Sequence, residues 1–310
     1  MTTAVVFAYH SVGVRCLSVL LAHDIEVKLV VTHEDAPGEN IWFPSVAALA
    51  QEQRIPVITP PDPHEPRAFA KIKAAAPDFI FSFYYRSMLK PEVLAVARRG
   101  AYNMHGSLLP KFRGRVPINW AIIHGETQTG ASLHEMVVKP DAGRLVDQMA
   151  VPIYPNDTAR EVFDKVVVAA ELVLDRSLEP LMAGVAKHTP MDLSKGSYFG
   201  GRKPEDGRID WRSSAAHIHN LVRAVAPPFP GAFTEIDGER LFIHRTRLLG
   251  AAQLAARPAA TLFAPEGAQQ IGAICADGRS LALLETALAR GPISLNEFVL
   301  RFGRGPIFPT

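Results

Sequence analysis

Three polar side chains in the middle of the chain have the types and spacing that acyl transfer to an amine requires. Asn103 and His105 stand two residues apart in the stretch Asn-Met-His-Gly-Ser-Leu-Leu-Pro, and Asp141 follows 36 residues after His105 in the run Lys-Pro-Asp-Ala-Gly. An amide N–H can donate to the oxyanion that forms when an amine attacks an acyl carbon, and an imidazole can accept the proton that the amine loses. A carboxylate can orient the imidazole and raise its basicity. We therefore predict that these three residues are catalytic.

The stretch before His105 predicts how the first two side chains are positioned. Residues 100–103 indicate the end of a short strand, and side chains two apart on a strand share a face. Asn103 and His105 are therefore expected to point into one cavity. The spacing alone is equally compatible with an Asn that caps a turn beside a partly buried His.

Apolar runs and helical periodicity predict an α/β fold around these residues. The runs 4–9 and 27–31 flank a helical stretch through Cys16, which is the pattern of a βαβ unit. The alternation continues with a helix at 45–53, a strand at 57–58, a helix at 66–75 and a strand at 79–83. It predicts a doubly wound, Rossmann-like parallel sheet with helices on both faces, whose ligands bind at the carboxyl ends of the strands.

The second half of the sequence predicts a smaller β domain. Thr158-Ala-Arg-Glu161 has the form of a capping box and precedes a long helix to residue 181, so we place a catalytic domain at 1–189. The polar segment 190–206 is the predicted linker, and 207–305 is the predicted antiparallel β domain, with Ser213 as the cap of a helix. Asp-Gly pairs at 237–238 and 277–278 indicate hairpins there. Residues 301–310 are expected to form a loose tail.

The composition narrows the class of protein. A chain of 310 residues with 48% hydrophobic content is long enough for one large core and a smaller one. A net charge of +2 is too small to indicate a nucleic-acid partner by itself. No stretch reaches the roughly 18 uncharged apolar residues of a membrane span, and the N-terminus lacks the pattern of a signal peptide. Cys16 and Cys275 lie in separate apolar segments and indicate free thiols, so we expect an untargeted cytoplasmic protein without a membrane partner.

Two kinds of ligand motif are missing from the sequence. The turn from Tyr9 to Gly13 holds one glycine, and neither the dinucleotide fingerprint G-x-G-x-x-G nor the ATP-binding P-loop occurs. The histidines have no Cys or His partners at metal-ligand spacing, so we predict no metal site.

The residues around the predicted catalytic group, taken with Ser82-Phe-Tyr-Tyr-Arg86 and the turn Asp141-Ala-Gly143, resemble the 10-formyltetrahydrofolate-dependent formyltransferases. One motif is most similar to the sugar branch of that family, in particular to the formyltransferase domain of the bifunctional polymyxin-resistance enzyme. This motif is His-Gly-Ser-Leu-Leu-Pro-Lys-Phe-Arg-Gly-Arg. The resemblance runs from Val5 to about Phe233. It implies His105 as the proton-transfer group, Asn103 as the stabiliser of the transition state and Asp141 as the residue that raises the basicity of the histidine.

The resemblance also implies ligands and their sites. The implied co-substrate is 10-formyltetrahydrofolate, with no metal, and the implied acceptor is UDP-4-amino-4-deoxy-L-arabinose, an amino sugar of lipid A modification and polymyxin resistance. The C-terminal domain is expected to be an open barrel similar to an OB-fold. At position 87 the sequence has Ser where the compared family member has His. The implied folate pocket consists of Ser87, Met88, Leu89, Arg115, Val137, Val138, Lys139, Pro140 and Asp141.

Two classes of acceptor compete within this family, nucleotide sugars and methionyl-tRNA. Methionyl-tRNA formyltransferases carry a lysine-rich insertion after the second strand, whereas segment 32–46 here holds three acidic residues and no Lys or Arg. From residue 207 onward the chain has 11 Arg, no Lys and 8 acidic residues, which is not the stripe of cations that binds a polyanion. We therefore predict a nucleotide sugar as the acceptor and no nucleic-acid partner.

Three further residues are candidates for contacts with that acceptor. Arg202 and Arg223 can each present a guanidinium fork to a diphosphate, and Tyr84 can stack on a base. Exposed cations on a linker and a helix are equally compatible with the two arginine positions, and core packing is the favoured interpretation of Tyr84. A folate-binding module without catalysis, or a hydrolase that releases formate from the same co-substrate, also remains an alternative.

Overall fold

The computed structural model describes residues 1–249 and 258–309, which fold into two compact units. The first unit comprises Met1–Pro117, Gln128–Pro152 and Phe163–Gly200, and the second comprises Ile118–Thr127, Ile153–Val162 and Gly201–Thr310. The second unit thus takes up two short segments from the first 200 residues. The domain boundaries 1–189, 190–206 and 207–305 stay a prediction.

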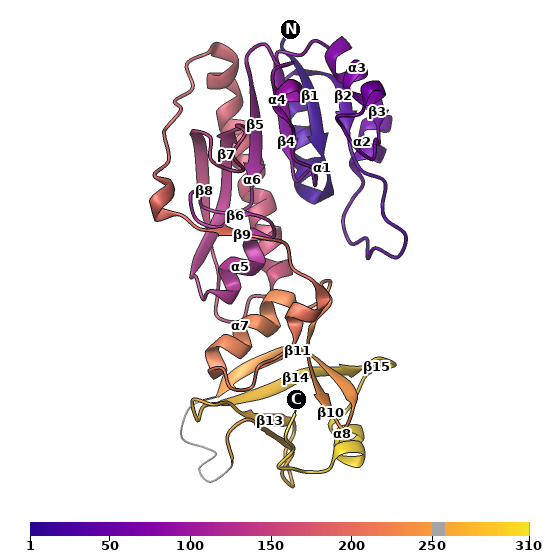
Figure 1. The fold of residues 1–310 in the computed structure, drawn as a ribbon, viewed down its shortest axis with the longest axis vertical. Helices are drawn as coiled ribbons and strands as arrows, with labels where there is room; N and C mark the ends of the chain where they lie inside the picture. Colours follow the sequence, from indigo (N-terminus) through magenta and orange to yellow (C-terminus); the bar gives the residue numbers. More distant parts are fainter. Residues whose placement is uncertain (250–257, 310) are drawn as a thin grey trace. The chain divides into compact units, whose positions relative to one another are not determined.

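A seven-stranded sheet organises the first unit, in the order β3-β2-β1-β4-β5-β7-β8 (Figure 1). The first five strands in this order are parallel, as predicted, but β7 and β8 are antiparallel, so the sheet is mixed at one edge rather than parallel throughout. The α/β architecture expected from the sequence is confirmed. The strand bounds are β1 (Thr3–Ala8), β2 (Glu26–Val31), β3 (Val57–Ile58), β4 (Phe79–Phe83), β5 (Gly100–His105), β7 (Gln128–Glu135) and β8 (Leu145–Pro152).

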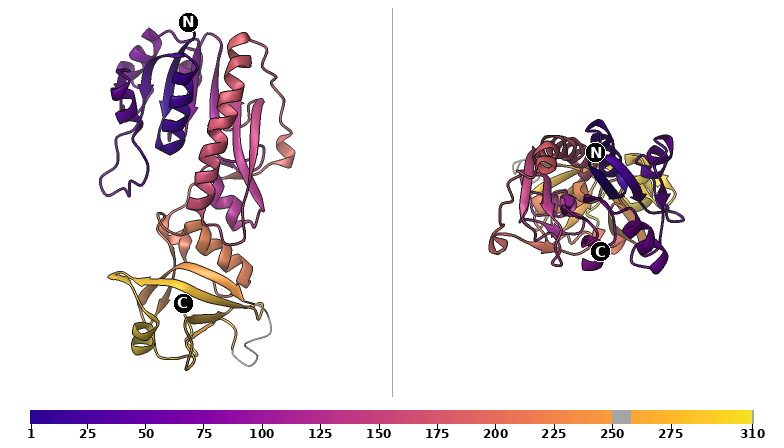
Figure 2. Two further views of the ribbon diagram at one scale, coloured as in Figure 1. Left: turned by 180° about the vertical axis from the view of Figure 1, so that it is seen from behind. Right: turned by 90° about the horizontal axis from the view of Figure 1, so that it is seen from above.

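Helices cover both faces of this sheet because its central strands are apolar on both sides. Val5 and Phe7 of β1 pack with Ile72 of α3 and Val93 of α4 in one buried cluster. On the other face, seen from behind in Figure 2, α1 and α6 lie over the strands. The helix bounds are α1 (His10–Ala22), α2 (Val46–Glu52), α3 (Pro66–Ala74), α4 (Pro91–Leu94) and α6 (Ala159–Ala183).

The capping box predicted before α6 is confirmed. The backbone N–H of Thr158 donates to the Glu161 carboxylate at 2.7 Å, and the backbone N–H of Glu161 donates to the Thr158 hydroxyl at 3.4 Å. These two bonds satisfy donors at the start of the helix that have no partner inside it.

The loop after β5 is held by the predicted linker. The short strand β6 (Arg113–Gly114) pairs in parallel with β9 (Tyr198–Phe199), which lies inside segment 190–206. Gly114 has a left-handed φ of 98°, and a Cβ there would come within 2.1 Å of the Phe199 carbonyl oxygen, so this close pairing needs glycine.

Three further short helices connect the elements, namely α5 (Pro117–Ile123), η1 (Leu193–Lys195) and η2 (Pro204–Gly207).

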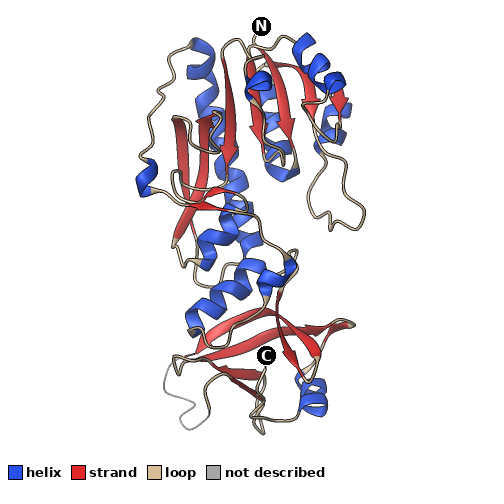
Figure 3. Ribbon diagram, viewed as in Figure 1, coloured by secondary structure: helices blue, strands red, loops and turns tan. Residues whose placement is uncertain are grey.

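The second unit is built on an antiparallel sheet in the order β10-β11-β14-β13-β12, with β15 paired to β14 (Figure 3). This confirms the predicted smaller C-terminal β fold. The bounds are α7 (Ala215–Val225), β10 (Ala232–Ile236), β11 (Glu239–Leu249), β12 (Thr261–Phe263), β13 (Ile271–Ile274), β14 (Ser280–Leu288), β15 (Gly291–Pro292) and α8 (Leu295–Phe302).

Local signals in this unit are confirmed with two corrections. Asp237 and Gly238 both have left-handed φ, 52° and 79°, and form the turn between β10 and β11. The cap of α7 is Ser214, which accepts from His217 N–H, rather than Ser213. The expected loose tail is wrong within the described residues, because α8 extends to Phe302 and Ile307 exchanges two backbone hydrogen bonds with Leu262.

Candidate functional site

The first unit contains a cavity of about 500 Å³ at the carboxyl ends of β1, β4 and β5. The strand order reverses between β1 and β4, and open α/β sheets bind their ligands at such a reversal. Side chains from these strand ends and from the loop after β7 line the cavity. The three residues predicted to be catalytic, Asn103, His105 and Asp141, are all among them.

His105 is buried and held from two sides. It is the last residue of β5, two residues after Asn103 on the same face of the strand. Its Nε2 lies 2.8 Å from the carbonyl oxygen of Phe112, which can only accept, so Nε2 carries a proton and donates it. Its Nδ1 lies 3.7 Å from Oδ1 of Asp141. Nδ1 is therefore the nitrogen that can exchange a proton, and a carboxylate stands beside it.

Asp141 occupies a constrained position in the loop after β7. Its backbone is left-handed, with φ of 48°, and its Oδ2 accepts the Gly114 N–H at 2.8 Å. Burial alone would raise the pKa of Asp141. At the acid pH where this carboxyl group titrates, three contacts lower its pKa instead, and they hold it well below the usual range. These contacts are the charges of His105 and His134, a hydrogen bond from His134, and the Gly114 N–H. The carboxylate is therefore charged when it faces the His105 ring.

Sequence reasoning missed a second histidine at this site. His134 of β7 pairs with Asn103 of β5 in the sheet, and its side chain is only 2% exposed. Its Nε2 lies 3.1 Å from Nδ2 of Asn103 and 3.4 Å from Oδ1 of Asp141. The two partners are separated by 31 residues in the chain, so only the register of β5 with β7 brings them together. The one available signal was a histidine inside a strand-like segment seven residues before Asp141.

The predicted folate pocket is brought together in large part. Ser87, Met88, Leu89, Arg115, Val137 and Pro140 line the same cavity as Asp141. Val138 and Lys139 lie in the same loop, but both are exposed and neither belongs to the lining. Tyr198 of β9 also lines the cavity, which the sequence did not predict.

Tyr84 lines the cavity in an unusual conformation. Its φ is 57°, a left-handed value that bulky residues rarely adopt. Its hydroxyl is buried and finds no hydrogen-bond partner in the described part of the chain. A Cβ at Gly106 would come within 2.0 Å of this hydroxyl, so the glycine after His105 gives the tyrosine its room. Backbone outliers that persist at a cavity are typical of functional positions.

Arg202 and Arg223 belong to the second unit. Arg202 donates to the Asp206 carbonyl oxygen at 2.7 Å, and its guanidinium carbon lies 4.8 Å from the centroid of the Trp120 ring. Arg223 is buried and donates to the carbonyls of Tyr154 and Asp157 at 3.2 and 3.1 Å. Burial lowers the pKa of both guanidinium groups. Their contact with an acceptor stays a prediction.

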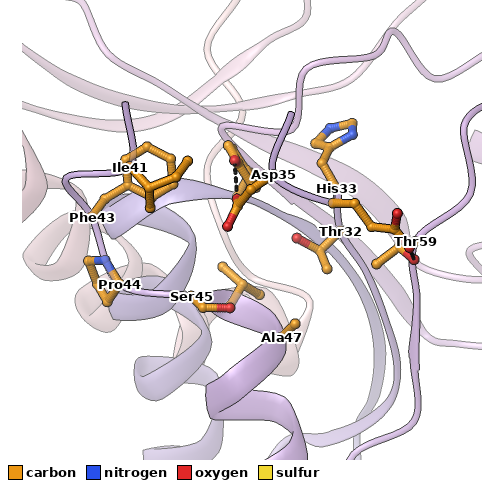
Figure 4. A pocket seen from close by; sticks show the side chains of 12 residues that line it. Thr32, His33, Asp35, Ile41, Phe43, Pro44, Ser45, Ala47 and Thr59 are labelled. Atoms are coloured by element: carbon orange, nitrogen blue, oxygen red, sulfur yellow. Dashed lines mark hydrogen bonds between the residues drawn. The ribbon is translucent and has the colours of Figure 1, made fainter. Parts of the chain in front are cut away.

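A smaller cavity of about 210 Å³ lies at the carboxyl ends of β1, β2 and β3 (Figure 4). It shares Tyr9 with the larger cavity, and the Tyr9 hydroxyl donates to Asp35 at 2.6 Å. Glu34 and Asp35 bring two carboxylates to its wall, and the ring of Phe43 is also part of the lining. This lining disfavours a phosphate group.

No group of three or more His, Cys, Asp or Glu side chains within 1–249 and 258–309 is placed to hold a metal ion. No helix in the described ranges is long and apolar enough to cross a membrane.

Comparison with known protein families gives two matches. The formyl transferase family matches residues 15–178, and the formyl transferase C-terminal domain matches residues 202–301. The chain therefore belongs to the formyl transferase family, as the resemblance implied, and it is a formyltransferase enzyme.

Several solved structures share the fold of this chain. An N-formyltransferase from Helicobacter canadensis, in complex with folinic acid and dTDP-3-aminofucose, superposes with a TM-score of 0.69 at 20% identity, covering 91% of this chain and 99% of that one. A sugar N-formyltransferase from a Shewanella species gives 0.62 at 18% identity, covering 78% and 96%. HypX from Aquifex aeolicus gives 0.65 at 19% identity, covering 100% of this chain and 51% of that one. At these identities the likeness establishes the fold.

Proposed function

We propose that this formyltransferase moves the formyl group of 10-formyltetrahydrofolate to the 4-amino group of a nucleotide-linked amino sugar, with UDP-4-amino-4-deoxy-L-arabinose as the acceptor. The observation that supports the proposal most directly is the convergence of Asn103, His105 and Asp141 in one cavity of a chain in this family. A product of this kind would serve lipid A modification and polymyxin resistance.

The cavity has the size and lining that a folate needs. Its volume of about 500 Å³ lies within the roughly 300–1,000 Å³ of small-molecule sites. Met88, Leu89 and Val137 offer apolar surface for a flat ring, and Arg115 offers a cation for a carboxylate. The folate would supply the formyl carbon, and two related structures were solved with folinic acid or tetrahydrofolic acid.

The residues of the site divide the chemistry between them. The neutral amine of the sugar adds to the formyl carbon while His105 takes its proton at Nδ1, next to the Asp141 carboxylate. Asn103 donates an N–H to the formyl oxygen as that oxygen becomes negative. The protonated His105 then returns a proton to the leaving nitrogen. Because Nε2 of His105 is hydrogen-bonded to the Phe112 carbonyl oxygen, both proton transfers use Nδ1.

The loop after β2 supports a nucleotide sugar over methionyl-tRNA. Within this loop, Glu39 pairs with Arg86 and the Asp35 carboxylate accepts a hydrogen bond from the Tyr9 hydroxyl. The described part of the loop therefore presents carboxylates and no cation that could bind the phosphates of a tRNA. The structure from Helicobacter canadensis contains an amino sugar linked to dTDP, which is the same class of acceptor.

An acceptor panel tests the proposal. The purified chain is incubated with 10-formyltetrahydrofolate and, separately, with UDP-, dTDP- and GDP-linked amino sugars and methionyl-tRNA, and formylated product is measured by mass spectrometry. We expect formylation of an amino-sugar nucleotide, fastest with UDP-4-amino-4-deoxy-L-arabinose. Formylation of methionyl-tRNA alone would overturn the acceptor class, and formate release without any formylated acceptor would favour a hydrolase.

A further inference from the structure

His134 lies where two of the proposed catalytic groups meet. It is buried on β7 directly opposite Asn103, and its Nε2 is within 3.1 Å of the Asn103 amide nitrogen and 3.4 Å of an Asp141 oxygen. A buried imidazole in a strand needs partners for both nitrogens, since an unpaired polar group there is costly. The identity of those partners fixes its protonation.

The contact at Nδ1 determines the tautomer of His134. Nδ1 lies 2.8 Å from the carbonyl oxygen of Glu135, and a carbonyl can only accept a hydrogen bond. Nδ1 therefore carries a proton. In the neutral ring Nε2 is then a bare lone pair, and it accepts an N–H from Asn103.

This bond sets the direction of the Asn103 amide. An amide that faces a lone pair must turn its nitrogen toward it, because its oxygen has no proton to donate. One N–H of Asn103 is then used by His134, and the second N–H of the same nitrogen is left for a ligand in the cavity.

Resting on the proposed function, we propose that His134 is a positioning residue that fixes the Asn103 amide as an oxyanion donor for the formyl group. Donors that are already oriented need no reorganisation during the reaction, which is the main source of oxyanion stabilisation. Two titratable groups face the ring, and the positioning role requires the neutral form of His134 beside them. The Asp141 carboxylate lies beside Nε2, and the His105 ring is 6.4 Å away, centroid to centroid. A protonated His134 would donate to Asp141 instead, would compete with His105 for that carboxylate and would no longer accept from Asn103.

Two amide substitutions separate positioning from packing. In His134→Gln the side-chain amide reaches the former position of Nε2 and can still accept from Asn103, whereas in His134→Asn it reaches only the position of Nδ1. Both variants are neutral, polar and smaller than histidine. We expect kcat of His134→Gln to stay within about tenfold of wild type and kcat of His134→Asn to fall by about 100- to 1,000-fold, the usual loss of one oxyanion donor. The KM for the folate should change by less than about threefold in both.

The Asn103→Ala background supplies the matched control. If His134 acts through Asn103, the difference between His134→Gln and His134→Asn should disappear when Asn103 is alanine. Calorimetric binding of 5-formyltetrahydrofolate, used as a probe that does not transfer its formyl group, should be equal in both variants and shows that the cavity is intact. An equal loss of kcat in both variants, or losses that persist in the Asn103→Ala background, would overturn the proposal.

Histidine NMR tests the same inference without turnover. ¹⁵N-histidine spectra at neutral pH, with the His134 signals assigned by their loss in His134→Gln, should show a protonated Nδ1 and a bare Nε2 whose shift moves in Asn103→Ala. A proton on Nε2 of a neutral ring would overturn the positioning role even in an active enzyme. An enzyme that transfers formyl to no acceptor, yet shows the bare Nε2 and its response to Asn103→Ala, would instead overturn the proposed function and leave the contact standing.

Discussion

The imidazole of His105 donates from Nε2 to the carbonyl oxygen of Phe112 at 2.8 Å, and this bond leaves Nδ1 as the only ring nitrogen available for proton exchange. Phe112 lies in the loop that β9 holds in place, with a left-handed φ of 55°. The position of the general base is therefore set by a backbone carbonyl as well as by the neighbouring carboxylate. Since Nδ1 is the nitrogen nearest Asp141, the positive charge forms where it is best stabilised.

The first prediction concerns the proposed catalytic group. His105→Ala and Asn103→Ala should each lower kcat by about a hundredfold or more, because one removes the proton acceptor and the other an oxyanion donor. The double variant should lose little more than the worse single one, since the groups act as a unit. Initial rates at saturating acceptor measure this. His23→Ala, which removes a histidine paired with Asp175 at the surface, is the control and should retain full activity. More than about a tenth of the rate in either single variant would rule out the mechanism.

The second prediction concerns the pH dependence of stability. The pKa of Asp141 in the folded chain lies well below its usual range, whereas the unfolded chain binds a proton near pH ~3.9. The carboxylate therefore stabilises the folded state fully above about pH 5, and this contribution is lost as the pH falls toward the folded-state pKa. We expect the difference in free energy of unfolding between wild type and Asp141→Asn to shrink from about pH 5 to pH 2 in urea titrations. A difference that stays constant over this range would show that Asp141 is not held charged by its neighbours.

Local patterns predicted the parts of this fold that depend on local sequence. The apolar runs placed β1, β2 and β4 correctly, and the Asp237-Gly238 pair placed a hairpin, because strand burial and turn geometry leave a signal within a few residues. The spacing of Asn103 and His105 likewise predicted a shared face, which β5 provides. These features need no knowledge of distant partners.

Pairing between distant segments left no comparable signal. The antiparallel direction of β7 and β8, and with it the approach of His134 to Asn103, depends on which strand pairs with β5. The tail was misjudged for the same reason, since the bonds between Ile307 and Leu262 join segments 45 residues apart. The carbonyl partner of His105 was missed because any residue type offers a carbonyl, so Phe112 is specified by loop geometry alone.

The third prediction concerns Tyr84. Its buried hydroxyl has no partner within the described chain, and burial raises its pKa well above the usual range, so it stays a neutral donor. An unpaired buried hydroxyl costs about 1–3 kcal/mol, and we predict that the acceptor pairs with this one. Tyr84→Phe should therefore raise the free energy of unfolding by about 1 kcal/mol while raising the KM for the acceptor by about fivefold to tenfold. Chemical denaturation and steady-state kinetics measure the two effects. Destabilisation of the variant, with an unchanged KM, would show that the hydroxyl serves the fold.

The fourth prediction concerns the phosphates of the acceptor. If Arg202 meets the diphosphate of a nucleotide sugar, Arg202→Gln should raise the KM for the acceptor by about tenfold or more, since a charge-assisted hydrogen bond contributes about 1.5–3 kcal/mol. Neither kcat nor the KM for the folate should change much, because a contact far from the formyl group binds the ground state and the transition state equally. Arg212→Gln is the matched control, since Arg212 is an exposed arginine of the same unit that pairs with Asp210.

Ionic strength then separates the two classes of acceptor. Contacts with only two phosphates predict a shallow dependence of acceptor affinity on salt, whereas a tRNA that contacts many phosphates loses affinity by orders of magnitude between about 50 and 200 mM salt. The KM for the acceptor is measured across this range for wild type and Arg202→Gln. It should rise only slightly with salt in wild type, and the rise should be smaller in the variant. A steep salt dependence with methionyl-tRNA, together with inactivity on every amino-sugar nucleotide, would contradict the nucleotide-sugar assignment and leave the roles of Asn103, His105 and Asp141 unaffected.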